Sequence, residues 1–360
     1  MPEHAAMSRM AAAFRFGPAA MLAGAVNLGH NTQMKFLLLS LTLASALFSA
    51  SLFSACDKKT ETKTKPEASA KSEASTEAVS PEKAPEPTPE EKEKAREELA
   101  NKALERVPEI LKGIAELRGL PFKSDVPAEY QSSKDFREFV KKEIQKELPP
   151  EKNQKLGKAL AHVGLIEKEI DLATTLEDAM VTQAGAYYDP EQKKFFVVMV
   201  MDNKMMMDTI SSHELTHALQ DQYFDLKPYY MDNDGDDKTT LSEDQLNARR
   251  FIVEGEATLL MVAYGGYSLA KINVLQEPHV QGLRSQLGMM AKMDIDSLVA
   301  ESKSQAGQFA DMGGDFAKSI EAMDTIPLYI MVPLLESYMK GSLPVYETYV
   351  AGGWDAVANL

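Results

Sequence analysis

The sequence predicts an α+β fold that is rich in helices and contains a small sheet. Apolar residues recur at helical spacing between Leu99 and Leu117. A run of β-branched and aromatic residues from Lys194 to Met201 has the composition and length of a strand. Neither Pro nor Gly occurs between Met205 and Phe224, so this next segment predicts a helix that directly follows the strand.

Residues 1–55 predict export and a lipid anchor. A short basic start at Met34-Lys35 is followed by an apolar segment, residues 36–53, and then by Cys56, the single cysteine of the chain. This order resembles a bacterial lipoprotein signal, although Phe53 stands where Leu is usual. We therefore expect residues 1–33 to be an upstream extension and Cys56 to carry the lipid, on the periplasmic or extracellular side of the cell membrane. The alternative is an uncleaved anchor of about 20 apolar residues.

Composition and periodicity divide the rest of the chain into three parts. Residues 56–91 consist mainly of Lys, Glu, Pro, Ser, Thr and Ala, which cannot bury a core, so they predict an extended tether. Residues 92–170 predict a helical subdomain, and residues 171–360 a second, larger domain. The chain stops at Leu360 inside a predicted helix, which favours a truncated carboxyl end.

Further elements follow from local patterns. We expect helices at Phe136–Leu148 and Gln154–Leu165, and short strands within Phe122–Tyr130 and Gly185–Tyr188. From Leu246 onward the chain is predicted to be mostly helical. Its expected breaks are Gly265-Gly266, Pro278, Pro327, Pro333 and Pro344.

The segment His213-Glu214-Leu215-Thr216-His217 carries the strongest chemical signal. On a helix, His213 and His217 lie one turn apart on the same face, so both imidazoles can bind one metal ion. Glu214 lies about 100° round the helix from His213 and can instead take a proton from a water molecule on that metal. The pattern therefore predicts a Zn²⁺ site with its own general base.

Zinc needs a third protein ligand, and Phe251–Val262 offers two candidates. Glu254 and Glu256 interrupt this otherwise apolar segment of helical length. A carboxylate in such a place is costly to bury unless it is paired or bound to a cation. Because the two are about 200° apart on a helix, only one of them can face the metal.

These two motifs, His-Glu-Leu-Thr-His at 213–217 and Glu-Gly-Glu-Ala at 254–257, resemble those of the gluzincin metallopeptidases, which include thermolysin. The resemblance implies a zincin-like domain, Zn²⁺ as cofactor, Glu254 as the third ligand, Glu214 as the general base and a peptide or protein substrate. The longer string His213–Gln222 also resembles a group of uncharacterised bacterial lipoproteins, which supplies no substrate.

The sequence departs from the thermolysin pattern near the third ligand. Thr258 stands where an acidic residue usually orients a zinc histidine. Asp221, four residues after His217, is our candidate for that role, and an ordinary solvated or capping aspartate is the alternative. The residue that would stabilise an oxyanion stays open among Tyr223, Tyr264, Tyr267 and His279.

Three function classes are compatible with these observations. The leading one is a membrane-tethered zinc metallopeptidase. The others are an envelope lipoprotein in which zinc only supports the fold, and a hydrolase of a non-protein amide. A formal net charge of −15 argues against nucleic acid as a partner. The acidic segment Asp232–Asp237 does not fit the register of a calcium loop and predicts a solvated loop.

Overall fold

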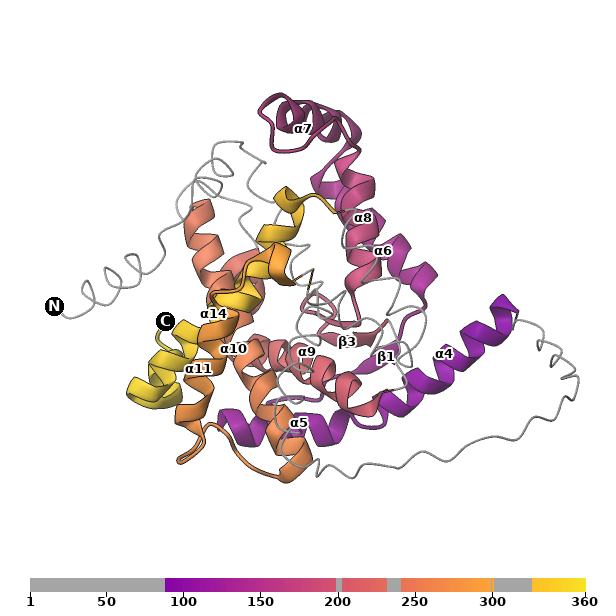
Figure 1. The fold of residues 1–360 in the computed structure, drawn as a ribbon. Coiled ribbons are helices and arrows are strands. Elements are labelled where there is room, and N and C mark those ends of the chain that lie inside the picture. Colours follow the sequence, from indigo (N-terminus) through magenta and orange to yellow (C-terminus); the bar gives the residue numbers. More distant parts are fainter. Residues whose placement is uncertain (1–87, 199–202, 232–240, 299, 301–325) are drawn as a thin grey trace, which may run out of the picture.

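The protein was analysed as a computed structural model that describes residues 88–198, 203–231, 241–298, 300 and 326–360. This part of the chain is helix-rich with one small three-stranded sheet, so the predicted α+β class is confirmed (Figure 1). The lipoprotein signal, nearly all of the tether and the acidic segment 232–237 lie outside the described residues. None of the described helices combines the length and apolar character that crossing a bilayer requires.

The described elements follow one another along the chain. They are α4 (Pro89–Leu104), α5 (Val107–Arg118), β1 (Ala128–Tyr130), α6 (Ser133–Glu147), α7 (Pro150–His162), α8 (Leu172–Gln183), β2 (Ala186–Asp189), β3 (Lys194–Val197), α9 (Lys204–Phe224), the π-helical turn η2 (Lys227–Met231), α10 (Glu243–Ala270), α11 (Val280–Met290) and α14 (Leu328–Val357). Among them, α4 and α9 are the helices with the most contacts to the sheet.

The sheet has the strand order β1-β3-β2. β3 pairs parallel with β1 and antiparallel with β2, with Tyr187 opposite Phe196 in the second pair. Both short strands expected near residues 128 and 186 are present. β2 and β3 are almost completely buried, which explains their aromatic and β-branched composition.

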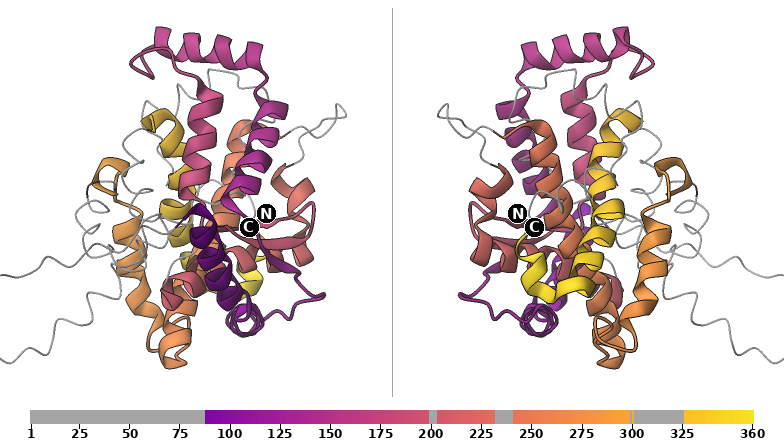
Figure 2. Two further views of the ribbon diagram at one scale, coloured as in Figure 1. Left: turned by 90° about the vertical axis from the view of Figure 1, so that its right-hand side faces the viewer. Right: turned by 90° about the vertical axis from the view of Figure 1, so that its left-hand side faces the viewer.

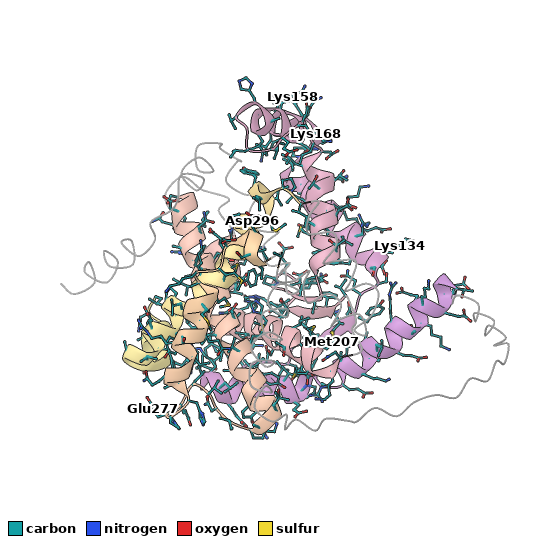
Figure 3. The ribbon with its side chains drawn as sticks, in the orientation of Figure 1. Lys134, Lys158, Lys168, Met207, Glu277 and Asp296 are labelled. Carbon is teal, nitrogen blue, oxygen red and sulfur yellow. The ribbon has the colours of Figure 1, made fainter. Side chains whose placement is uncertain are left out.

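α6 and α8 pack against each other and form an arm that leads away from the sheet, with α7 across its far end (Figure 2). Lys158 and Lys168 lie at this outer end of the arm (Figure 3). Ser132 begins α6 by accepting a hydrogen bond from the backbone N–H of Asp135, and Asp171 caps α8 in the same way through Thr174. One hydrophobic core connects the arm, the sheet and the long helices.

α9 is the central helix, with contacts to α5, β2, β3 and α10. Asn203 caps its start by accepting a hydrogen bond from the N–H of Met206, and it ends at Asp225, whose φ of 49° is left-handed. α10 begins with a capping box in which Ser242 and Gln245 bond each other's backbone N–H groups. The predicted helix after the strand is therefore confirmed.

Some of the helix breaks that we expected do not occur. α10 continues through Gly265-Gly266, where a Cβ on Gly266 would lie 2.8 Å from Val274 Cγ1, so Gly266 makes room for the chain that follows the helix. α14 continues through Pro333 and Pro344, and its backbone leaves helical φ/ψ values at Gly352-Gly353, where Gly353 has a φ of 69°. Packing of α14 against α10 and α11 overrides the local tendency of proline to end a helix.

Candidate metal centre

Two long helices bring the three predicted metal ligands together. His213 and His217 come from α9 and Glu254 from α10, and all three side chains are fully buried. His213 Nε2 lies 3.1 Å from Glu254 Oε2 and 3.2 Å from His217 Nε2, and the third side of this triangle, from His217 Nε2 to Glu254 Oε2, measures 3.3 Å.

The size of this triangle fits a small divalent metal. Ligand atoms about 2.0–2.1 Å from a tetrahedral ion lie about 3.3 Å from one another. Two imidazole nitrogens and one carboxylate oxygen converge at that spacing, and Glu254 Oε1 has no hydrogen-bond partner in the described part of the chain. The cluster of His213, His217 and Glu254 can therefore hold a metal ion.

The carboxylate of Glu254 controls the protonation of this cluster. Burial alone would lower the pKa of His217, but the charge of Glu254 and its hydrogen bond outweigh burial and raise that pKa to about 9. Burial would raise the pKa of Glu254, but the two imidazoles lower it to about 2. For His213, burial dominates and its pKa is lowered. At neutral pH Glu254 is therefore ionised, and His217 holds a proton that a metal ion would have to displace.

Glu214 lies beside the cluster and is not one of the three converging residues. Its side chain is fully buried, and its Oε2 accepts a hydrogen bond of 3.2 Å from the backbone N–H of Tyr188 in β2. The adjacent strand therefore helps to hold this carboxylate, in keeping with the expected position about 100° round the helix from His213.

Gln220 is the residue that orients His217, and the sequence analysis did not identify it. The Nδ1 atom of His217 lies 2.8 Å from Gln220 Oε1. An amide oxygen only accepts hydrogen bonds, so Nδ1 keeps its proton when the ring is neutral, and Nε2 is then the nitrogen with a lone pair for a metal. The spacing of three residues on one helix is the signal that indicates this contact.

The structure separates the roles of the two glutamates that the sequence left open. Glu256 is 5% exposed and does not reach the metal cluster. Its Oε1 accepts a hydrogen bond from Arg118 Nε, and its Oε2 accepts one of 2.9 Å from Gln220 Nε2. Glu256 is therefore an ion-pair partner, while Glu254 belongs to the cluster, as the resemblance implied.

Asp221 does not take the role that we considered for it. Its carboxylate accepts hydrogen bonds from Tyr188 Oη and Lys193 Nζ, both at 2.7 Å, and from the backbone N–H of Leu226 at 3.1 Å. These bonds connect the end of α9 to β2 and to the turn after it, because Asp221 lies on the β2 side of the helix. The orienting position is filled by Gln220 instead.

None of the four oxyanion candidates is placed at the cluster by a described contact. Tyr223 Oη donates to the carbonyl of Pro121, Tyr267 Oη donates to Glu116, the ring of Tyr264 lies against Gly113, and His279 is an exposed residue before α11. The aromatic ring that does reach the cluster belongs to Tyr338 of α14. Its centroid lies 5.3 Å from that of His213, with the rings tilted by 31°.

His213 and His217 are held by different means. His213 Nδ1 is buried and has no hydrogen-bond partner among the described residues, and neither has Thr258 Oγ1. The ring of Tyr338 holds His213 by packing, whereas His217 is held by a hydrogen bond. Nothing in the local sequence indicates Tyr338, because it is brought to the cluster by the packing of a distant helix.

Comparison with known proteins assigns no class to this arrangement. No family model, no curated protein and no solved structure matches the chain.

Proposed function

We propose that this protein is a zinc-dependent metallopeptidase that is exported and held at a membrane through a lipid on Cys56. The observation that carries the proposal is the buried triangle of His213, His217 and Glu254, with Glu214 beside it on the same helix. Two imidazoles and one carboxylate form a ligand set that is common in catalytic zinc sites, and that set leaves one position of a tetrahedral ion free. Mass spectrometry of the amino-terminal peptide tests the anchor, and an unmodified Cys56 in the mature chain would argue against it.

The ligands and Glu214 have separate tasks in this proposal. Bound zinc supplies Lewis acidity, which polarises a carbonyl group and lowers the pKa of a water molecule. Glu214 accepts a proton and returns it to the leaving amine. The backbone N–H of Tyr188, an uncharged donor, fixes the direction of the Glu214 carboxylate. Peptide-bond hydrolysis is the reaction that these groups support best.

Glu214→Gln is the variant that tests the proposal most directly. The amide has nearly the same shape as the carboxylate and can still accept the hydrogen bond from Tyr188, but it is a poor base. Zinc content of the full chain should be unchanged, and cleavage of a mixed peptide library should fall by at least about a hundredfold. Unchanged cleavage by this variant would refute the role of Glu214.

A metal site that only supports the fold is the second candidate. The observation that favours it is the complete burial of His213, Glu214, His217 and Glu254, because catalysis requires that substrate reach the metal. A chain that holds one zinc ion and cleaves no peptide would exclude the peptidase and leave this second candidate beside the hydrolase of a non-protein amide. Zinc bound together with peptide cleavage would exclude it.

A further inference from the structure

We propose that Arg118, Glu256 and Gln220 form a buried relay of positioning residues that fixes the metal-binding nitrogen of His217, and that Trp354 supports its outer end. The proposal rests on the proposed metal site. Arg118, Gln220 and Trp354 lie outside the two sequence motifs for zinc, and Glu256 lies within the second one without being a ligand. The four residues come from α5, α10, α9 and α14. We refer to Arg118, Glu256 and Gln220 as the relay.

The first step is the orientation of the Gln220 amide. Its Nε2 donates to two acceptors on α10, the carbonyl of Val253 at 3.0 Å and Glu256 Oε2 at 2.9 Å. An NH₂ group satisfies two acceptors and an amide oxygen satisfies neither, so the oxygen must face His217. The direction of the amide therefore decides which nitrogen of His217 carries the proton.

The second step is the position of these acceptors on α10. Val253 precedes the ligand Glu254, and Glu256 follows it by two residues. Gln220 thus connects the helix that carries His217 to the turn that carries Glu254. One side chain sets both the tautomer of one ligand and the distance between the two ligand helices.

The third step is the pairing of Glu256 with Arg118. Arg118 Nε donates to Glu256 Oε1, and the two side chains are 4% and 7% exposed. The other oxygen, Oε2, is the one that accepts from Gln220 Nε2. Because both oxygens of Glu256 act as acceptors in these contacts, the NH₂ group of Gln220 stays turned toward Glu256.

The outer end of the relay is supported by α14. The guanidinium carbon of Arg118 lies 4.5 Å from the centre of the Trp354 ring, and Trp354 Nε1 donates to the carbonyl of Leu117 at 2.9 Å. Arg118 Nη2 has no hydrogen-bond partner in the described part of the chain, and the indole face is its neighbour instead. Trp354 therefore holds both the side chain of Arg118 and the end of α5.

A network of this kind can also be purely structural, and the test has to separate the two roles. A structural network affects the stability of the fold, whereas a positioning relay affects the tautomer of His217 and the affinity for metal in a chain that is still folded. Removal of a residue that orients a metal-binding histidine typically weakens metal binding about 10-fold to 100-fold.

The test compares Gln220→Ala with Gln222→Ala in the full chain. Gln222 is a matched control, because it lies on the same helix two residues away and its side chain bonds only Lys123 and Ser124 in the described contacts. Zinc affinity is measured by competition with a chelator, and the tautomer of His217 by long-range ¹H–¹⁵N correlation. We expect Gln220→Ala to lose about 10-fold to 100-fold in affinity and to show a mixture of tautomers, while Gln222→Ala stays within about twofold of the wild type.

A second variant keeps the proposal testable if Gln220→Ala does not fold. Glu256→Gln keeps the shape of the side chain but can donate as well as accept, so the amide of Gln220 loses its fixed direction. We expect a smaller loss, about threefold to tenfold, and again mixed tautomers. Wild-type affinity and a single tautomer in the folded variants would overturn the proposal.

Failure of the relay and failure of the proposed function give different results. If the wild-type chain takes up no zinc, the proposed function fails. The relay is then still tested by the tautomer of His217 in the metal-free chain, measured at a pH at which the ¹H–¹⁵N correlation itself shows the ring to be neutral. Peptide cleavage with normal zinc affinity in Gln220→Ala would support the function and refute the relay.

Discussion

Gly255→Ala should damage the metal site through a contact between helices, without removing any ligand. A Cβ atom on Gly255 would lie 2.4 Å from the carbonyl carbon and oxygen of Gly341 in α14, and 3.0 Å from its Cα. These are backbone atoms and cannot rotate away. Because ordinary contact begins near 3.4 Å, α14 would have to retreat from α10 by about 1 Å.

The expected cost follows from this overlap. Overpacking of a well-packed interface typically costs about 1–3 kcal/mol of unfolding free energy, and the better helix propensity of alanine offsets up to about 1 kcal/mol of that. We expect a net loss of about 1–2 kcal/mol. Glu254 is the adjacent residue, and its Oε2 lies within 3.3 Å of both imidazoles, so a shift of α10 should also weaken metal binding by about tenfold.

Urea unfolding of the metal-free chain and zinc competition with a chelator measure these two effects. Gly282→Ala is the matched control, because Gly282 is also helical and a Cβ there meets nothing within 4 Å. This control should gain up to about 1 kcal/mol from helix propensity and should bind zinc normally. If Gly255→Ala were as stable as Gly282→Ala and bound zinc as tightly, the reasoning from the helix contact would be refuted.

Three further predictions concern the protons of the metal cluster and the ion pair of Arg106 with Asp208. The charge of Glu254 outweighs burial and raises the pKa of His217 to about 9, so a metal ion must displace a proton at neutral pH. Zinc affinity, measured by competition with a chelator, should therefore rise with pH up to about 9. A zinc affinity that does not change with pH would contradict this prediction. In the metal-free chain, the pair of Glu254 with His217 should contribute fully to the free energy of unfolding between pH 4.5 and pH 6.5, the ordinary pKa values of the two groups. The contribution should disappear as pH rises through about 9, where His217 loses its proton, or falls through about 2, where Glu254 gains one. Urea unfolding at several pH values measures this dependence. Asp208→Ala leaves Arg106 without the carboxylate that it binds through two nitrogens. We expect this variant to lose about 3 kcal/mol of unfolding free energy in urea. Lys204→Ala should lose about 1 kcal/mol or less, because the exposed amine of Lys204 bonds the same carboxylate from the surface. Equal losses of stability for Asp208→Ala and Lys204→Ala would show that the pair of Arg106 with Asp208 is not the main contribution.

Local patterns predicted the elements that carry the ligands. A histidine repeat of four residues places two rings on one face of a helix whatever the rest of the chain does, and the strand before it is indicated by its β-branched and aromatic residues. The same local reasoning was misled at Gly265-Gly266, Pro333 and Pro344. There, contacts with other helices decide the backbone, and those contacts are absent from a local window of sequence.

Most of the residues that position the ligands could not be predicted from local patterns, because their partners are distant in the sequence. Arg118 pairs with Glu256 across 138 positions of the chain, and single residues at such separations carry no periodic signal. Gln220 could have been found from its spacing to His217, but a glutamine on a helix has no chemical signature of its own.

None of the three converging ligands comes from α14, yet this helix contacts one ligand directly and residues that position the other two. Tyr338 packs against His213, Gly341 lies against Gly255 next to Glu254, and Trp354 covers Arg118, from which the relay leads to His217. Tyr338 and Gly341 are three residues apart and thus share one face of the helix. A small displacement of α14 should consequently change the distances within the ligand triangle while the ligands themselves stay intact. The metal affinity of this chain is therefore expected to depend on how α14 packs against α10 as well as on the three residues that bind the ion.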